Sequence, residues 1–97
     1  MKTTIIQAIR HREVLELRYH GYSRLIEPHV YGTDKNGCEK LRCFQVGGGS
    51  VSNEPIDWKM LNVVEIDSVH PTGHNFLHAR TEYNRDDPVI VTIYAQL

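Results

Sequence analysis

A turn signal between two strand-like runs constrains this chain more than any other feature of its sequence. Asn36-Gly37 is the dipeptide most typical of tight hairpin turns, because both residues accept positive φ. It stands between Val30-Tyr31 and the run from Lys40 to Val46. The sequence therefore predicts an antiparallel hairpin here and a fold built on local strand pairing.

Further runs of strand character flank this hairpin. Before it, residues 14–19 alternate in polarity and place Leu15, Leu17 and Tyr19 on one face. A second extended run follows Gly21, and the proline at position 28 limits it to a sheet edge or a bend. After the hairpin we expect a flexible loop over 47–55, a fourth strand over 58–61, a turn and fifth strand over 63–69 stopped by Pro71, a mostly irregular stretch over 72–88, and a β-prone tail over 89–94.

The first residues carry a helical pattern. Ile5, Ile6, Ala8 and Ile9 fit helical spacing after Thr3-Thr4, either of which can cap a helix that ends near His11. One short helix followed by about five short strands predicts a mainly β fold, a small and strongly bent five-stranded barrel. We expect a single domain over 1–97, with the helix at about 3–11, the barrel at about 13–70, and a C-terminal loop and β-prone tail at 71–97.

Size and charge exclude several classes of protein. A chain of 97 residues buries one core but not two, and no apolar run approaches the ~18 residues of a membrane span. The net charge of −1 gives no overall attraction for a polyanion, although residues 1–26 carry a net +3 and residues 61–97 a net −3. The start of the chain lacks the apolar region of a signal peptide. We therefore expect a cytoplasmic protein with reduced cysteines and no membrane contact.

Motifs for enzyme chemistry are weak. The run Gly47-Gly48-Gly49-Ser50 lacks the Gly-Lys-Ser/Thr end of a phosphate-binding loop. His70, His74 and His78 are spaced by four, as metal ligands on one helix face are, but Pro71 interrupts such a helix. We expect no catalytic residues, no metal and no cofactor, since a metal-dependent hydrolase would depend on these histidines alone.

The run around Arg42 combines cations with an aromatic ring. Period-2 alternation places Lys40, Arg42 and Phe44 on one face of the third strand. Cations meet phosphates and a ring stacks a base, so this face suits single-stranded nucleic acid. A solvated strand face is the structural alternative. Trp58 also has two interpretations, as a core anchor of the fourth strand or as the wall of a ligand groove beside Lys59.

Several segments together resemble the WYL domain family. The resemblance begins with TIIQAIRHREVLELRYHGYSR and continues through IEPHVYGTDKNGCEKLRCFQVGG to DWKMLNVVEI, and the tail NFLHARTEYNRDDP is similar to that of single-domain members. It covers nearly the whole chain. The resemblance implies an Sm-like, SH3-type barrel and a ligand-sensing module of bacterial regulators, one that responds to single-stranded nucleic acid or nucleotide ligands.

The resemblance also implies a binding site on the barrel. Carried over by position, the polar contacts are Arg24, His29, Arg42 and Lys59, with Tyr19 and Tyr31 lining the site. The arginines and the lysine would contact phosphates, and the histidine would donate a hydrogen bond. Phe44 or Tyr31 would stack a base.

Two functions of different classes follow from these features. The first is a stand-alone, non-enzymatic sensing domain in transcription regulation, which binds single-stranded nucleic acid or a nucleotide-like anion through a basic barrel face. The second is a protein-interaction or self-association module that has lost ligand binding, because Asn62 and Glu65 stand where the family concentrates arginines. Its partner would be a regulator or effector protein, or a second copy forming a homodimer through Val89 to Tyr94.

Overall fold

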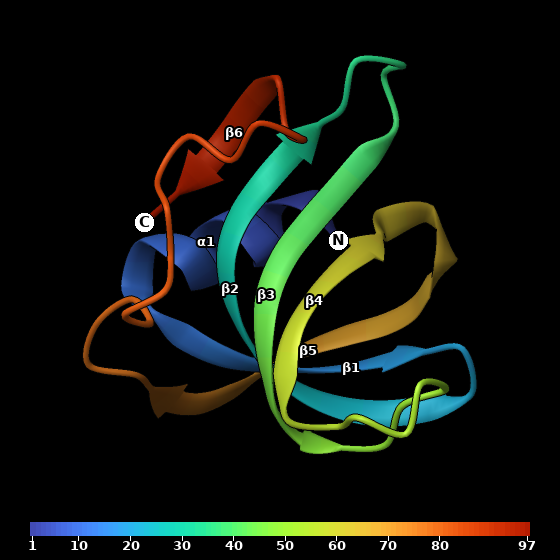
Figure 1. The fold of residues 1–97 in the computed structure, drawn as a ribbon. Helices are drawn as coiled ribbons and strands as arrows, with labels where there is room; N and C mark the ends of the chain where they lie inside the picture. Colours follow the sequence, from blue (N-terminus) through green and yellow to red (C-terminus); the bar gives the residue numbers. More distant parts are fainter.

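The computed structural model describes residues 1–97 and arranges them as one curved antiparallel sheet with a helix packed against it (Figure 1). In chain order the elements are α1 (Lys2–His11), β1 (Glu13–Tyr19), β2 (Tyr22–Thr33), β3 (Glu39–Gly48), β4 (Asp57–Asn62), the 3-10 turn η1 (Val63–Glu65), β5 (Ile66–Asn75) and β6 (Thr92–Gln96). The predicted mainly β class with a short N-terminal helix is confirmed. No helix has the length and hydrophobicity of a membrane span.

The long strand β2 organises the sheet. β3 pairs with one edge of β2, while β1 and β6 share the other edge, β1 opposite residues 22–26 and β6 opposite residues 30–33. The sheet has six strands in the order β4-β3-β2-β1-β5, with β6 beside β2 off this path. The sixth strand is one more than the sequence predicts. No ladder joins β4 to β5, so closure of the sheet into a barrel stays a prediction.

The predicted hairpin between β2 and β3 is confirmed, although its turn is longer than the Asn-Gly pair. Gly37 has a φ of 80°, whereas Asn36 does not adopt positive φ. Asp34 closes the turn, because its Oδ1 accepts the backbone N–H groups of Asn36 at 2.9 Å and Cys38 at 3.0 Å. An aspartate at the first position of such a turn is common for this reason.

The structure agrees with the prediction for one of the two strand prolines and not with that for the other. At Pro28 the register of β2 against β3 shifts, so the predicted bend is present, but the strand continues to Thr33. The prediction that Pro71 stops the fifth strand is wrong, since β5 runs through it to Asn75. β5 pairs only with β1, and an edge strand accepts a proline because its outward edge needs no N–H donor.

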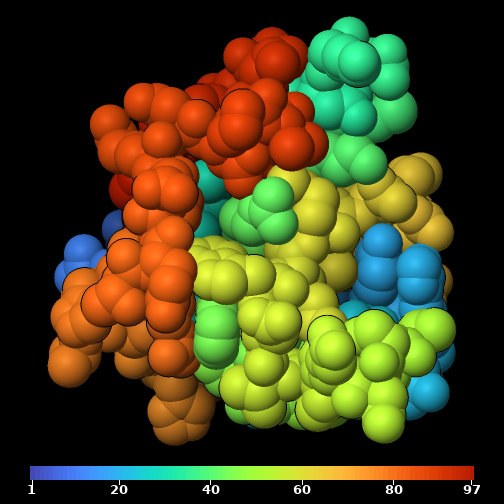
Figure 2. All heavy atoms as spheres, viewed as in Figure 1, coloured from blue at the N-terminus to red at the C-terminus, as the bar shows by residue number.

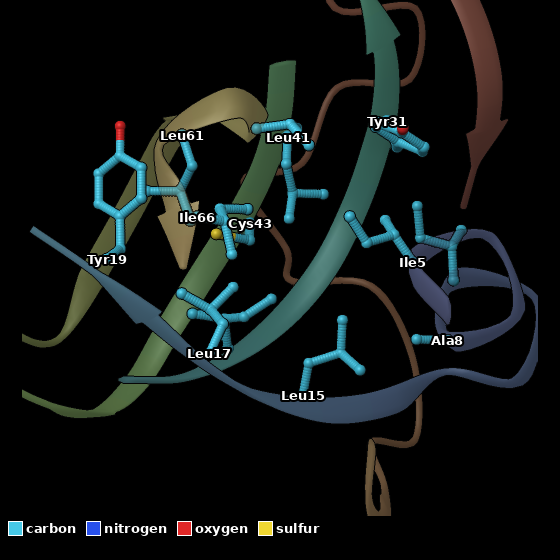
Figure 3. Close-up of a cluster of buried hydrophobic side chains, with 13 residues drawn as sticks. Ile5, Ala8, Leu15, Leu17, Tyr19, Tyr31, Leu41, Cys43, Leu61 and Ile66 are labelled. Carbon is cyan, nitrogen blue, oxygen red and sulfur yellow. The ribbon is translucent and has the colours of Figure 1, made fainter. Parts of the chain in front are cut away.

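The core lies between the helix and the concave face of the sheet (Figure 3). α1 contributes Ile5, Ala8 and Ile9, all essentially buried, and the strands contribute alternate residues such as Leu15 and Leu17, as predicted. The predicted threonine cap is wrong: Met1 is the N-cap residue and no side chain caps the helix. Packing of one apolar face against the sheet is therefore what holds this short helix.

An irregular segment, residues 76–91, connects β5 to β6 and is called the strap below. Val91 N–H donates to the Thr33 carbonyl oxygen at the end of the strap, where β6 begins to pair with β2. In Figure 2 the strap, in orange, lies against the green and yellow atoms of β3 and β4. The β-prone tail predicted over 89–94 is thus shifted to 92–96, and it pairs within the chain.

Candidate ligand-binding site

β3 and β4 present a polar and aromatic row on the convex side of the sheet, called the outer face. Lys40, Arg42 and Phe44 alternate with buried neighbours, which confirms the alternation predicted for this strand. The register between the strands sets Trp58 opposite Phe44, and their rings meet edge to face at 5.4 Å. Trp58 is only partly buried, so it serves as the wall of a groove and not as a core anchor.

The strap forms the second wall of a pocket on this outer face. The pocket has a volume of about 420 Å³, a size typical of small-ligand sites. Tyr83 of the strap stacks with Trp58, with ring centroids 6.3 Å apart and planes inclined by 27°. The lining residues are Arg42, Trp58, Glu82, Tyr83, Asn84, Asp87, Pro88 and Val89.

Arg42 is the cation of this pocket. Its Nε donates to Asp87 Oδ2 at 2.8 Å, and the side chains of Arg42 and Asp87 are 28% and 10% exposed. The two terminal nitrogens of the guanidinium make no hydrogen bond within the protein, so they are free to donate to a ligand. Glu82 adds a second carboxylate, which makes the pocket polar but not basic.

Arg24 lies on the opposite side of the sheet. It is 3% exposed, and its Nη2 donates to the Tyr19 carbonyl oxygen at 3.1 Å while Nη1 donates to Gln45 Oε1 at 3.4 Å. No carboxylate pairs with it, and its buried Nε has no partner. Desolvation lowers the pKa of this guanidinium. The structure therefore does not bring Arg24 to the pocket that contains Arg42.

Lys59 also points away from that pocket. It lies opposite Cys43, a buried residue, and so alternates with Trp58 along β4. Its Nζ donates to the hydroxyls of Ser50 and Ser52, both at 3.2 Å, and to the Glu54 carbonyl oxygen at 2.7 Å. These contacts hold the loop after β3 against the end of the sheet.

The two predicted tyrosines belong to the core. Tyr19 is 5% exposed, and its hydroxyl accepts the backbone N–H of Asn62 at 3.1 Å. Tyr31 is fully buried and donates its hydroxyl proton to Glu39 Oε1 at 2.9 Å. Desolvation, together with Glu39, raises the pKa of Tyr31. Neither ring lines the pocket beside Arg42.

His29 of β2 links this strand to the strap through a hydrogen bond. The ring is fully buried, with Nδ1 2.8 Å from the Glu27 carbonyl oxygen and Nε2 3.1 Å from the Arg80 backbone nitrogen. A carbonyl only accepts and an amide N–H only donates, so Nδ1 carries the proton and Nε2 accepts. Burial lowers the pKa of His29. Trp58 and Tyr83 pack edge-on against the ring, at 4.8 and 5.0 Å.

Acidification is expected to destabilise the fold through His29. Its folded-state pKa lies below the ordinary 6.5, so the unfolded chain binds this proton more readily. The stabilising contribution is therefore fully present above pH 6.5 and is lost as the pH falls through the folded-state pKa. Urea unfolding at several pH values measures this slope. A His29→Phe variant should reduce it, whereas His70→Gln, which changes an exposed histidine, should leave it unaltered.

No protein-family model, curated protein or solved structure matches this chain. No group of three or more His, Cys, Asp or Glu side chains is arranged to hold a metal ion. Cys38 and Cys43 are both free, the first exposed and the second buried.

Of the predicted site residues, the structure brings Arg42 and Phe44 to the outer face beside Trp58. The strap contributes residues that no sequence pattern predicts, above all Tyr83 and Asp87. No periodicity marks those residues, because an irregular segment has none. The available signal was compositional: an aromatic residue among polar and charged residues, in the segment Thr81 to Pro88.

Proposed function

We propose that this chain is a non-enzymatic ligand-binding domain that takes a nucleotide, or a nucleotide unit of single-stranded nucleic acid, in the pocket between the outer face and the strap. The observation that carries the proposal is an arginine with two free guanidinium nitrogens beside two stacked aromatic rings. The resemblance to the WYL family supports the same class of function, a sensing module in regulation.

The pocket chemistry supports each part of such a ligand. Trp58 offers an aromatic face, and stacking of a base on such a ring is worth about 1–3 kcal/mol. Arg42 offers a planar set of donors that matches a phosphate oxygen pair. Glu82 and Asn84 line the same space, where a carboxylate accepts hydrogen bonds from base amino groups and an amide both donates and accepts.

The positions of the other cations limit the electrostatic part of binding. Arg24 is buried on the far side of the sheet, and Lys59 is bonded to its own loop. Arg42 is then the one pocket cation available to a phosphate. Each phosphate contact to a single strand contributes about −0.7 to the slope of log K against log salt concentration. We expect a shallow slope of about this size, not the steep one of a broad basic face.

Arg42→Gln is expected to weaken binding of a labelled oligothymidylate about five- to tenfold and to reduce the salt slope by about 0.7, because one charge-assisted phosphate contact is lost. Fluorescence anisotropy at two salt concentrations measures both quantities. Lys59→Gln is the matched control and should leave the slope unchanged. A slope reduced by Lys59→Gln but not by Arg42→Gln would place the phosphate at the other end of the sheet and overturn the assignment.

A further inference from the structure

We propose that the strap is an internal competitor for this pocket: Asp87 occupies Arg42 as a ligand phosphate would, and Arg80 occupies Phe44 as a base would. The inference rests on the proposed function for the identity of the ligand, and it adds a built-in control of access to the same site. It is carried by the chemistry of two contacts and by the weak backbone attachment of the strap.

The first contact places an anion on the pocket cation. Asp87 Oδ2 accepts from Arg42 Nε at 2.8 Å, and with 10% exposure the aspartate side chain is almost entirely covered. A carboxylate presents two oxygens to a guanidinium in much the same geometry as a phosphate does. A phosphate that takes Nε as well as the terminal nitrogens must therefore displace Asp87.

The second contact places a flat cation on the aromatic ring next to the pocket. The guanidinium carbon of Arg80 lies 4.2 Å from the centroid of the Phe44 ring. Glu27 holds it there, accepting from Arg80 Nε at 2.8 Å and from Nη2 at 3.2 Å. A planar guanidinium and a planar base use the same aromatic face, so the ring that the sequence marks for stacking is already occupied.

The strap also separates two hollows on this face. One is the pocket beside Arg42, and the other, of about 360 Å³, lies along Phe44 and Phe76. Glu82 of the strap borders both. A shift of Glu82 alone would join the two hollows along the outer face.

Side chains, not backbone pairing, hold the strap in place. Between residues 77 and 90, backbone–backbone hydrogen bonds close only the internal turns at Tyr83 and Ile90. The attachments to the rest of the protein go through side chains, such as the Arg80 N–H on His29 Nε2. Segments held in this way open at a lower free energy than global unfolding. If Asp87 must leave Arg42 before a phosphate binds, the apparent affinity is the intrinsic affinity multiplied by the fraction of molecules in which Arg42 is free.

The test compares two neighbouring carboxylates in the full chain. Asp87→Asn removes the negative charge that faces Arg42. The variant keeps Oδ1, which accepts the Val89 N–H at 2.9 Å. Asp86→Asn removes the same formal charge one residue earlier, from an exposed side chain that contacts Gln96 and does not line the pocket. Asparagine tolerates the φ of 64° at position 86. Any effect of overall charge on binding is therefore common to both variants.

Two readouts separate the strap from the ligand. Trp58 is the chain's single tryptophan, so acrylamide quenching of its fluorescence reports opening of the pocket without any ligand. Asp87→Asn should raise this quenching and tighten oligothymidylate binding about fivefold. This factor is the size expected when one competing ion pair is lost. Asp86→Asn should do neither.

The outcomes distinguish this inference from the proposed function. Equal gains in affinity for both variants, or unchanged Trp58 quenching in Asp87→Asn, would overturn the competitor role. Increased quenching in Asp87→Asn alone, with no binding of oligothymidylate or of a mononucleotide by any form, would uphold the strap as a latch while refuting the nucleotide ligand.

Discussion

Replacing His29 with alanine is expected to lower the free energy of unfolding by about 3 kcal/mol, through a cavity and the loss of buried hydrogen bonds. His29 is fully buried, and both ring nitrogens have partners on separate segments. The alanine variant leaves the Arg80 N–H without its acceptor and opens space beside Trp58. Urea denaturation monitored by far-UV circular dichroism measures the loss.

Two further variants divide this loss into its causes. His29→Phe refills much of the space but cannot hydrogen-bond, so its loss should fall between those of His29→Ala and the native chain. His74→Ala changes an exposed histidine on β5 and should alter the stability by less than about 0.5 kcal/mol. Equal losses for His29→Ala and His74→Ala would contradict the structural role assigned here to the buried ring.

The role of His29 also explains why a ligand contact predicted from resemblance can turn out to be a structural one. A histidine in a sequence shows that a hydrogen-bonding group is present but does not identify its partner. The partner here is the Arg80 backbone, 51 residues away. The aromatic rings that enclose His29 belong to β4 and to the strap, and their approach depends on how that irregular segment returns to the sheet.

The local features of the fold follow from the sequence because their causes are local. Leu15, Leu17 and Tyr19 alternate with exposed neighbours, and the turn before β3 is specified by Gly37 and by the hydrogen bonds of Asp34. The pairing of β6 with β2 is different. It joins segments some 60 residues apart, and its register depends on contacts that no short pattern contains.

In the candidate site, too, the features with local causes are predictable from the sequence and those that depend on strand register are not. The alternation of β3 predicts that Arg42 and Phe44 share a face, and they do. The grouping of Arg24 and Lys59 with Arg42 required two strand registers, β2 against β3 and β3 against β4. Those registers set Lys59 opposite Cys43 and Arg24 opposite Gly48. One residue of shift exchanges the faces of a strand, so this part of the site could not be fixed without the structure.

Gly32→Ala is expected to destabilise the chain by about 3 kcal/mol, the upper range for overpacking a close contact. A Cβ at this position would lie 1.9 Å from the Thr92 carbonyl oxygen and 2.7 Å from Ile90 Cγ2. The nearer atom belongs to the backbone of β6, which cannot rotate away as a side chain can. Glycine in a strand marks such a close approach of another backbone. Urea denaturation gives the size of the loss.

Gly37→Ala provides the contrast, because the two glycines are needed for different reasons. Gly37 has a φ of 80° and open space around its Cβ position, so alanine there should cost only the backbone strain of about 1 kcal/mol. Gly32→Ala must instead push β6 away from β2. β6 begins directly after Val91, whose N–H attaches the end of the strap to Thr33, so the strap should loosen as well. Acrylamide quenching of Trp58 should therefore rise in Gly32→Ala and not in Gly37→Ala. An equal rise in both variants would show that the strap responds to lost stability in general, whereas a rise confined to Gly32→Ala would tie its closure to the β2–β6 ladder.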